Sequence, residues 1–127
     1  MAPLTVLLAD DHVPTRAGVR ASLEAHGMQV CGEVSTGEAA VEAARELRPD
    51  ICVMDTRMPG AGGIAATARI TAELPGTAVV MLAAEATDDE LFAALRAGAC
   101  GYLLKDTDPD RLGYAIEGVV HGEAALP

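Results

Sequence analysis

The sequence predicts an α/β fold in which five parallel strands form a doubly wound sheet with helices on both faces. Three observations support this prediction. The length of 127 residues suits one domain. Five short apolar runs alternate with five segments of helical periodicity. The runs are continuously apolar, as expected of parallel strands that are buried on both faces and joined by right-handed crossovers.

The first part of the chain predicts a strand, a helix and a second strand. Residues 4–9 form the apolar run that predicts the first strand. Residues 13–26 follow as a helix, because Pro14 suits a first helical turn and Gly27 is a common helix terminator. The second strand is predicted over Gln29–Val34, which leads directly into the next helix start.

The middle of the chain predicts a helix, a strand and another helix. Ser35 and Glu38 have the spacing of a capping box, which indicates that a helix starts there, and Pro49 closes that helix. Residues 51–54 are predicted as a buried strand. The turn-rich sequence after this strand leads to a helix from about residue 64 to residue 74.

The last part predicts two more strand–helix units. The fourth strand covers Ala78–Ala83, and Thr87 or Asp88 caps the helix after it. Gly101–Leu104 is the fifth strand, and residues 108–109 (Asp-Pro) open the final helix. The residues of these two helices expected to face the core are Leu91, Ala94, Leu95, Leu112, Ile116, Val119 and Val120.

The composition excludes several classes of function. A formal net charge of −10 argues against contact with nucleic acid, because phosphate binding requires clustered Lys and Arg. Cys31, Cys52 and Cys100 lack CxxC spacing, which indicates small core residues in a reducing cytosol. The sequence has neither a basic leader nor a long apolar span, so we expect a cytoplasmic protein with no membrane contact.

Charged residues follow the strands that are expected at the centre of the sheet. Asp10 and Asp11 end the first strand, Asp55 ends the third, and Lys105 with Asp106 ends the fifth. In the strand order 2-1-3-4-5, the first and third strands are neighbours where the order reverses, and ligands bind there at the carboxyl ends of the strands. We therefore expect Asp10, Asp11 and Asp55 to share one pocket.

Such a pocket requires a cation, because two carboxylates about 5 Å apart repel by roughly 3 kcal/mol at an effective dielectric constant near 20. Carboxylate oxygens favour Mg²⁺, which commonly bridges to phosphate. Lys105 adds a positive charge for a phosphoryl oxygen, so the set suits phosphoryl transfer onto an aspartate. A single acid at a strand end is ordinarily a solvated side chain, and it is the combination that indicates a site.

Three segments of the chain are distinctive: LLADDH at residues 7–12, VMDTRMPGAGG at 53–63 and RAGACGYLLKD at 96–106. Together they resemble the CheY-like receiver domains of two-component response regulators, in the branch of nitrate-response regulators with LuxR-type DNA-binding domains. Each is weakly specific alone, but their order and spacing are specific, and the similarity covers essentially the whole chain. The resemblance implies a flavodoxin-like (βα)5 fold with the strand order 2-1-3-4-5.

The resemblance also implies a role for each site residue. Asp55 is the phosphoacceptor and also a Mg²⁺ ligand, Asp11 is a direct Mg²⁺ ligand, and Asp10 is a ligand mainly through water. The backbone carbonyl of Arg57 is a further ligand, and Lys105 contacts the phosphoryl group. In the family, a histidine kinase is the usual donor, and phosphorylation regulates dimerisation and transcriptional output.

The end of the fourth strand departs from the family pattern. The family has Ser or Thr where this chain has Ala83; Ala84 also lacks a hydroxyl, and Thr87 lies four residues further on. Tyr102 falls at the aromatic switch position, where a packed and a moving side chain both remain open. A hydrogen bond to a charged group contributes about 1.5–3 kcal/mol. The alternative is therefore an atypical receiver, uncoupled from phosphorylation and regulated by a ligand, dimerisation or protein contact.

Residues 1–120 are interpreted as the receiver domain, and residues 121–127 as the start of a linker to an absent helix-turn-helix DNA-binding domain. A homodimer is expected. A third hypothesis is a small phosphohydrolase, which also forms an aspartyl phosphate, but this chain has Arg57 where such an enzyme has its acid/base Asp. We therefore interpret the domain as a signalling phosphoacceptor with at most slow self-dephosphorylation, and not as an enzyme.

Three further polar residues lie close to the acids in sequence. His12 is interpreted as an exposed loop residue rather than a metal ligand or a phosphorelay histidine. Arg16 and Arg20 fall on the first predicted helix, where a solvated helix face is favoured over a role in kinase docking.

Overall fold

The computed structural model describes residues 2–122. Its strands form one parallel five-stranded sheet in the order β2-β1-β3-β4-β5, which confirms the predicted fold and topology. The strands are β1 (Thr5–Ala9), β2 (Gln29–Val34), β3 (Ile51–Asp55), β4 (Ala78–Ala83) and β5 (Gly101–Leu104). The helices are α1 (Val13–Ala25), α2 (Gly37–Leu47), α3 (Gly62–Glu73), α4 (Asp88–Arg96) and α5 (Pro109–Val119).

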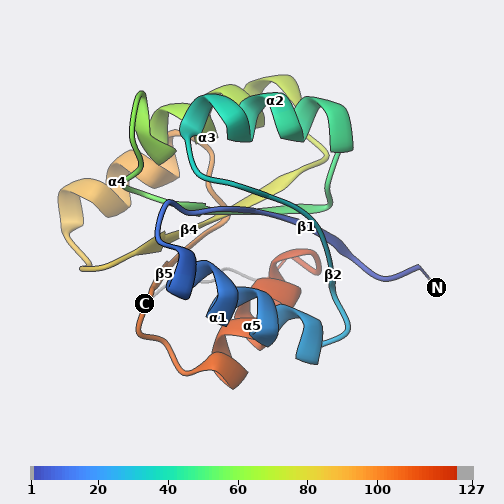
Figure 1. Ribbon diagram of the computed structural model, residues 1–127. Coiled ribbons are helices and arrows are strands. Elements are labelled where there is room, and N and C mark those ends of the chain that lie inside the picture. Colours follow the sequence, from blue (N-terminus) through green and yellow to red (C-terminus); the bar gives the residue numbers. More distant parts are fainter. Residues whose placement is uncertain (1, 123–127) are drawn as a thin grey trace.

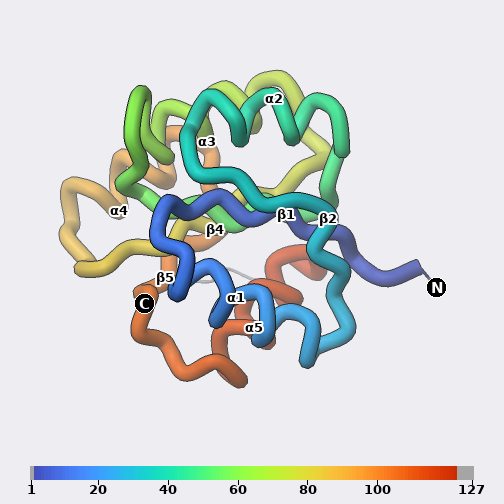
Figure 2. Tube along the Cα trace, in the orientation of Figure 1, coloured from blue at the N-terminus to red at the C-terminus, as the bar shows by residue number. Residues whose placement is uncertain are grey.

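The sheet lies between two layers of helices. Helices α2 and α3 lie over one face and α1 and α5 over the other (Figures 1 and 2), and α4 packs with the α2 and α3 layer through Ala94. Alternate strand residues therefore enter two separate cores. One core contains Leu7, Met54 and Met81, and the other contains Leu8, Val53 and Leu82. Burial on both faces explains why the strands are continuously apolar.

The parallel register brings the ends of β1 and β3 side by side. Ala9 pairs with Met54, so the residues that follow them emerge at the same edge of the sheet. On the other side of β3, Ala83 at the end of β4 pairs with Leu104 at the end of β5. The backbone alone thus gathers the ends of four strands, from distant parts of the sequence, around one location.

The start of α2 corrects one prediction. The N-cap is Thr36 and not Ser35, because the Thr36 hydroxyl accepts the backbone N–H of Ala39 at 3.1 Å. Glu38 does not complete a capping box; its carboxylate accepts the N–H of Ala61 at 3.0 Å and thereby ties α2 to the loop after β3. A capping box specifies only spacing, and here two adjacent residues are both good caps.

Three residues expected in the core are exposed. Leu95 is 41% exposed, because α4 is oriented so that Ala94 is buried and Leu91 is half-buried. Val120 is also 41% exposed, because α5 ends at Val119 and the next residue leaves the apolar stripe. Cys100 precedes β5 and is exposed, whereas Cys52 is fully buried as expected.

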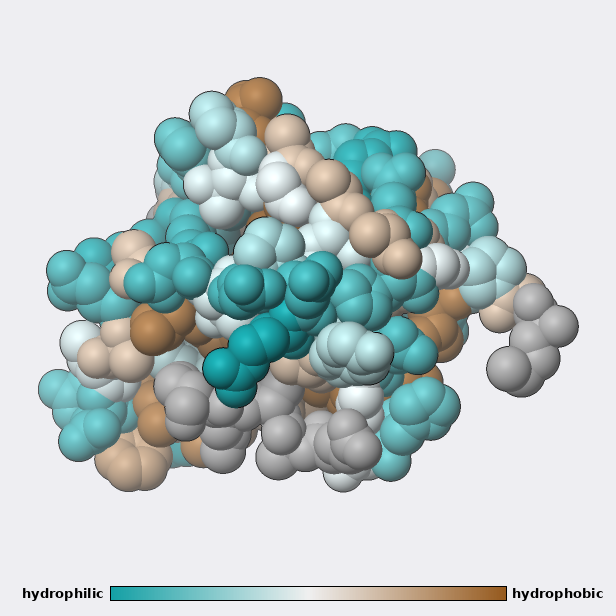
Figure 3. Space-filling model, turned by 90° about the horizontal axis from the view of Figure 1, so that it is seen from below, coloured by the Kyte–Doolittle hydropathy of each residue, from teal (hydrophilic) through white to brown (hydrophobic). Residues whose placement is uncertain are grey.

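None of the helices in residues 2–122 combines the length and apolar character needed to cross a bilayer. The face seen in Figure 3 is mainly hydrophilic, with hydrophobic areas that are small and separated. Single exposed apolar side chains of this kind, such as Val13 at 61% exposure, are normal on a protein surface.

Candidate functional site

The three carboxylates predicted to share a pocket do so. Each of Asp10, Asp11 and Asp55 offers a carboxylate oxygen, and these oxygens lie within 4.8 Å of one another. Asp10 follows β1, Asp55 ends β3, and both side chains are buried, whereas Asp11 is exposed. The pocket therefore has two buried acids at its base and one at its mouth.

Lys105 compensates part of this negative charge. It is the single lysine of the sequence, and its Nζ donates to Asp55 Oδ2 at 2.9 Å and lies 3.4 Å from Asp10 Oδ2. Burial acts to lower the pKa of Lys105, but the contacts with Asp55 and Asp10 outweigh burial and raise it above the ordinary value. The lysine therefore stays charged between the two buried acids.

Asp55 is held at the end of β3 by its own loop. Its Oδ1 accepts the backbone N–H of Arg57 at 3.1 Å. Burial raises the pKa of Asp55 and the Asp10 charge adds to this rise, whereas Lys105 and the Arg57 N–H oppose it. Gly63 at the start of α3 packs so tightly under Asp55 that an added Cβ would lie 1.9 Å from the Asp55 carbonyl oxygen. This close approach fixes the distance between α3 and the pocket.

Asp10 shows that the pocket fits a hard cation. Its Oδ1 accepts the backbone N–H of His12 at 2.8 Å. Its Oδ2 is buried and accepts no hydrogen bond from the described residues. Lys105 Nζ lies 3.4 Å from this oxygen but donates its hydrogen bond to Asp55, so one lysine is shared by two buried carboxylates and a second cation would complete the compensation. Oxygen ligands from carboxylates, water and a backbone carbonyl are the set that Mg²⁺ prefers, so these residues fit that ion.

Ala83 and Tyr102 lie near the ends of β4 and β5, and both are fully buried. The Tyr102 hydroxyl contacts Glu90 Oε1 at 2.9 Å and the Glu85 carbonyl oxygen at 3.3 Å. Burial and the Glu90 carboxylate raise the pKa of Tyr102. The Tyr102 side chain is therefore packed inward in this structure.

Two neighbours complete this region. Arg57 Nε lies 3.6 Å from Glu90 Oε2, so Glu90 contacts both Tyr102 and the residue that holds Asp55. The Thr87 hydroxyl accepts the N–H of Glu90 at 3.2 Å and caps α4. This contact engages Thr87 at the helix start, four residues away from the position of the missing hydroxyl.

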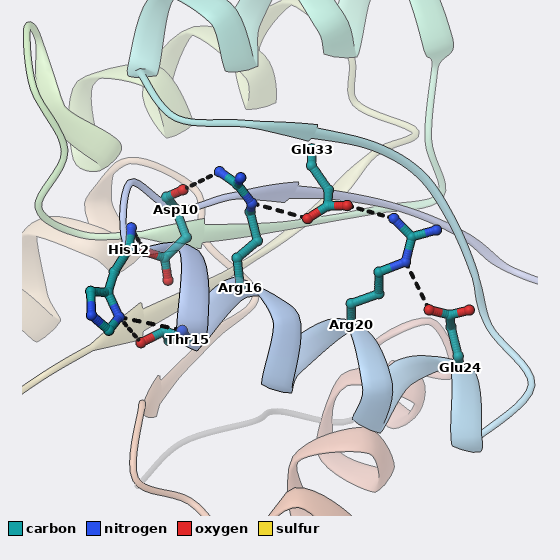
Figure 4. A network of polar contacts seen from close by, with 7 residues as sticks. All are labelled: Asp10, His12, Thr15, Arg16, Arg20, Glu24 and Glu33. Carbon is teal, nitrogen blue, oxygen red and sulfur yellow. Dashed lines mark hydrogen bonds and ion pairs between the residues drawn. The ribbon is translucent and has the colours of Figure 1, made fainter.

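The loop between β1 and α1 contains contacts that sequence reasoning missed (Figure 4). His12 is exposed, as expected, but it is also the N-cap of α1, because its Nδ1 accepts the N–H of Thr15. The interpretation of Arg16 as part of a solvated face is wrong. Its side chain is only 19% exposed, and it donates to the Asp10 carbonyl oxygen and pairs with Glu33. Arg20, at 42% exposure, does lie on the solvated face.

Comparison with known proteins agrees with this geometry. A family model described as the response regulator receiver domain matches residues 6–117, which include every residue of the pocket. The chain belongs to this family. Receiver domains are signalling domains of two-component systems that regulate transcription, and they generally bind Mg²⁺ at an acidic pocket.

Relatives of this receiver domain are response regulators of the NarL/LuxR type. It is 41% identical to the transcriptional regulatory protein YxjL of Bacillus subtilis over 95% of this chain and 56% of that protein. It is 35% identical to the nitrate/nitrite response regulator NarL of Escherichia coli over 98% of this chain and 58% of that protein. The receiver domain thus spans little more than half the length of these relatives.

Solved structures with a similar fold also come from NarL- and LuxR-type response regulators. The signal receiver domain of a NarL response regulator from Mycobacterium tuberculosis superposes with a TM-score of 0.91 at 32% identity, covering 97% of this chain and all of that one. A LuxR-family two-component response regulator from Aurantimonas superposes with the same TM-score at 35% identity, covering 97% of this chain and 89% of that one. The receiver fold is therefore established independently of the site residues.

Proposed function

We propose that this receiver domain accepts a phosphoryl group on Asp55 from a histidine kinase, in the presence of Mg²⁺, and thereby regulates dimerisation and transcriptional output. One observation carries the proposal. Three carboxylates from two strand ends converge within 4.8 Å, with Lys105 beside them and a buried Asp10 oxygen that accepts no hydrogen bond from residues 2–122. A structural role alone would not favour such a cluster, because like charges at this distance repel.

The contacts support distinct roles for the pocket residues. Asp10, Asp11 and Asp55, with the backbone carbonyl of Arg57, would hold Mg²⁺, which neutralises charge on phosphoryl oxygens when bound. Asp55 is the nucleophile: a new bond forms between its carboxylate oxygen and phosphorus, and the bond from phosphorus to the donor histidine nitrogen breaks. Lys105, now paired with Asp55 Oδ2, would then contact an oxygen of the transferred group.

The proposal also includes a second domain that follows the receiver domain in the full-length protein. We infer that residues 1–120 are the receiver module and that residues 121–127 begin a linker to a helix-turn-helix DNA-binding domain; residues 123–127 lie outside the described residues. The relatives support this inference, because the chain covers 56–58% of their length. The receiver itself would contact no DNA, since its formal net charge is −10. Its partners are the kinase and a second copy, in the cytoplasm.

Phosphodonor labelling tests the proposal. Incubation with Mg²⁺ and acetyl phosphate should add one phosphoryl group, detected by intact mass, and chelation of Mg²⁺ should prevent the addition. Asp55→Asn should abolish the adduct, whereas Asp106→Asn, which removes an exposed acid next to Lys105, should leave it. No adduct from either acetyl phosphate or a phosphorylated histidine kinase, or an adduct that persists in Asp55→Asn, would contradict the proposal.

A further inference from the structure

Asp10 is held by contacts at three of its four polar groups. Its backbone N–H donates to the Val34 carbonyl oxygen at 3.0 Å. Its backbone carbonyl oxygen accepts from Arg16 Nη1 at 2.8 Å, and its Oδ1 accepts from the His12 N–H. Oδ2 is the remaining group, and it faces the pocket, 3.4 Å from Lys105 Nζ. The three contacts thus determine where the free oxygen points.

Arg16 provides the contact that lies outside the loop and the sheet. It comes from α1, one turn beyond the cap of that helix, and its guanidinium bridges two acceptors (Figure 4). Nη1 donates to Asp10, and Nε donates to Glu33 Oε1 at 3.0 Å. A guanidinium holds several donors in one rigid plane, so a second acceptor fixes the direction of the first bond.

Glu33 anchors this arginine to β2. Its position in the sheet is set by pairing with Leu8 of β1. Its other carboxylate oxygen, Oε2, accepts from Arg20, which also pairs with Glu24 at 2.8 Å. The side chains of Arg16 and Glu33 are 19% and 29% exposed, so water screens their pair less than it screens a fully exposed one. The resulting clamp joins α1, β2 and the β1–α1 loop at Asp10.

We infer that Arg16, held by Glu33, is a positioning residue that aligns Asp10 for Mg²⁺ binding. The inference rests on the proposed function, because Mg²⁺ is the ion assigned to the pocket. Arg16 touches the backbone of Asp10 and none of its carboxylate oxygens, so it acts on the ion only through the ligand. Groups that orient metal ligands in this way typically change metal affinity by about 10-fold or more when they are removed.

The positive charge of Arg16 and its positioning of Asp10 have opposite effects on Mg²⁺ affinity, which makes the inference testable. A cation near the pocket repels Mg²⁺, so loss of its charge alone would tighten binding. Loss of the clamp would weaken binding, because Asp10 would no longer be held in line with Asp11 and Asp55. The sign of the change in Mg²⁺ affinity therefore separates the two roles.

Mg²⁺ titration of the purified chain by isothermal calorimetry provides the measurement. Arg16→Gln should weaken binding about 10-fold. Arg16→Lys keeps the positive charge but loses the planar guanidinium that donates to both Asp10 and Glu33. This variant should therefore also bind Mg²⁺ more weakly than the wild type. Glu33→Gln should weaken binding through Arg16. Arg45→Gln is the matched control, because Arg45 pairs with Glu73 through two hydrogen bonds and contacts neither Glu33 nor Asp10, and the Mg²⁺ affinity of this variant should stay within twofold of the wild type.

Thermal unfolding distinguishes positioning from general stability. A structural role would lower Tm equally with and without Mg²⁺, whereas the positioning role reduces the rise in Tm that Mg²⁺ produces. Equal or tighter Mg²⁺ binding by Arg16→Gln, or wild-type affinity in Arg16→Lys, would overturn the inference. If Arg16→Gln does not fold, Arg16→Lys and Glu33→Gln decide the question. A wild-type chain that neither binds Mg²⁺ nor takes a phosphoryl group would instead contradict the proposed function.

Discussion

The two sides of the pocket differ in how completely their polar groups are paired. The acidic side consists of Asp10, Asp11, Asp55 and Lys105, and the tyrosine side consists of Ala83, Glu90 and Tyr102. On the acidic side, a buried carboxylate oxygen of Asp10 lacks a hydrogen bond within the part of the chain that the structure describes. On the tyrosine side, the Tyr102 hydroxyl already has the Glu90 carboxylate as a partner, and Ala83 offers no hydroxyl to a phosphoryl group.

This difference separates the chemistry of the site from its response. The acidic side gains contacts when a cation and a phosphoryl group arrive, whereas the tyrosine side is paired before either is bound. A modification shifts a conformational equilibrium only through contacts that differ between the two states. Arg57 joins the two sides, because its N–H holds Asp55 and its guanidinium pairs with Glu90.

The largest expected effect is the loss of Lys105 from the acidic side. Lys105→Met leaves Asp10 and Asp55 buried without their cation, and the free energy of unfolding without Mg²⁺ should fall by about 2 kcal/mol, less than for a fully buried pair because Lys105 is partly exposed. Urea unfolding measures this loss. The double variant Asp55→Asn with Lys105→Met should recover part of it, since it removes the charge of Asp55 and leaves only Asp10 without its cation. Strictly additive losses would show that Lys105 does not stabilise the acids.

A hydroxyl at position 83 should allow the tyrosine side to respond to phosphorylation. Ala83→Thr adds two atoms to a fully buried position and should lower the free energy of unfolding by about 1–2 kcal/mol. It should also create acetyl-phosphate-dependent dimerisation, measured by sedimentation, because the new hydroxyl can bind the phosphoryl group. Ala84→Thr, at the exposed neighbouring position, is the control and should do neither. A wild-type chain that already dimerises on phosphorylation would mean that the tyrosine side responds without a hydroxyl.

The sequence was sufficient to predict the strands, because burial on both faces requires continuous apolar runs. Three of the five strands, β2, β4 and β5, have the predicted boundaries. Helix faces were less certain, because one residue at a helix end can lie on either side of the core boundary. Leu95 and Val120 show this: each continues an apolar stripe in sequence, but each is 41% exposed, Leu95 in the last turn of α4 and Val120 just beyond the end of α5.

The acids of the pocket were also predictable, because parallel strand ends meet at a known edge of the sheet. The clamp on Asp10 was not. Its key bond ends on a backbone carbonyl, which has no signature in the sequence, and Glu33 lies 17 residues from Arg16. Only the register of β2 against β1 brings Glu33 within reach. An arginine one turn beyond two adjacent acids, with a carboxylate late in the next strand, is the pattern that sequence reasoning could have used.

The smallest expected effect concerns the contact between the Glu90 carboxylate and the Tyr102 hydroxyl. Tyr114→Phe leaves Tyr102 as the single tyrosine, since the sequence has two, and its ionisation can then be followed by ultraviolet absorbance. Burial and Glu90 raise the pKa of Tyr102 above 10.0, so Glu90→Gln in this background should lower it, whereas Asp89→Asn, at an exposed acid of the same helical turn, should not.

The raised pKa of Tyr102 also predicts how the stability of these variants changes with pH. A raised pKa in the folded state means that the unfolded state loses the proton first, so stability should fall as pH rises from 10.0 towards the folded-state pKa of Tyr102. The fall should be smaller in Glu90→Gln, because the two pKa values lie closer together. An unchanged Tyr102 titration in Glu90→Gln would mean that Glu90 does not hold the tyrosine. The tyrosine side would then be free to respond to phosphorylation, and its contrast with the acidic side would disappear.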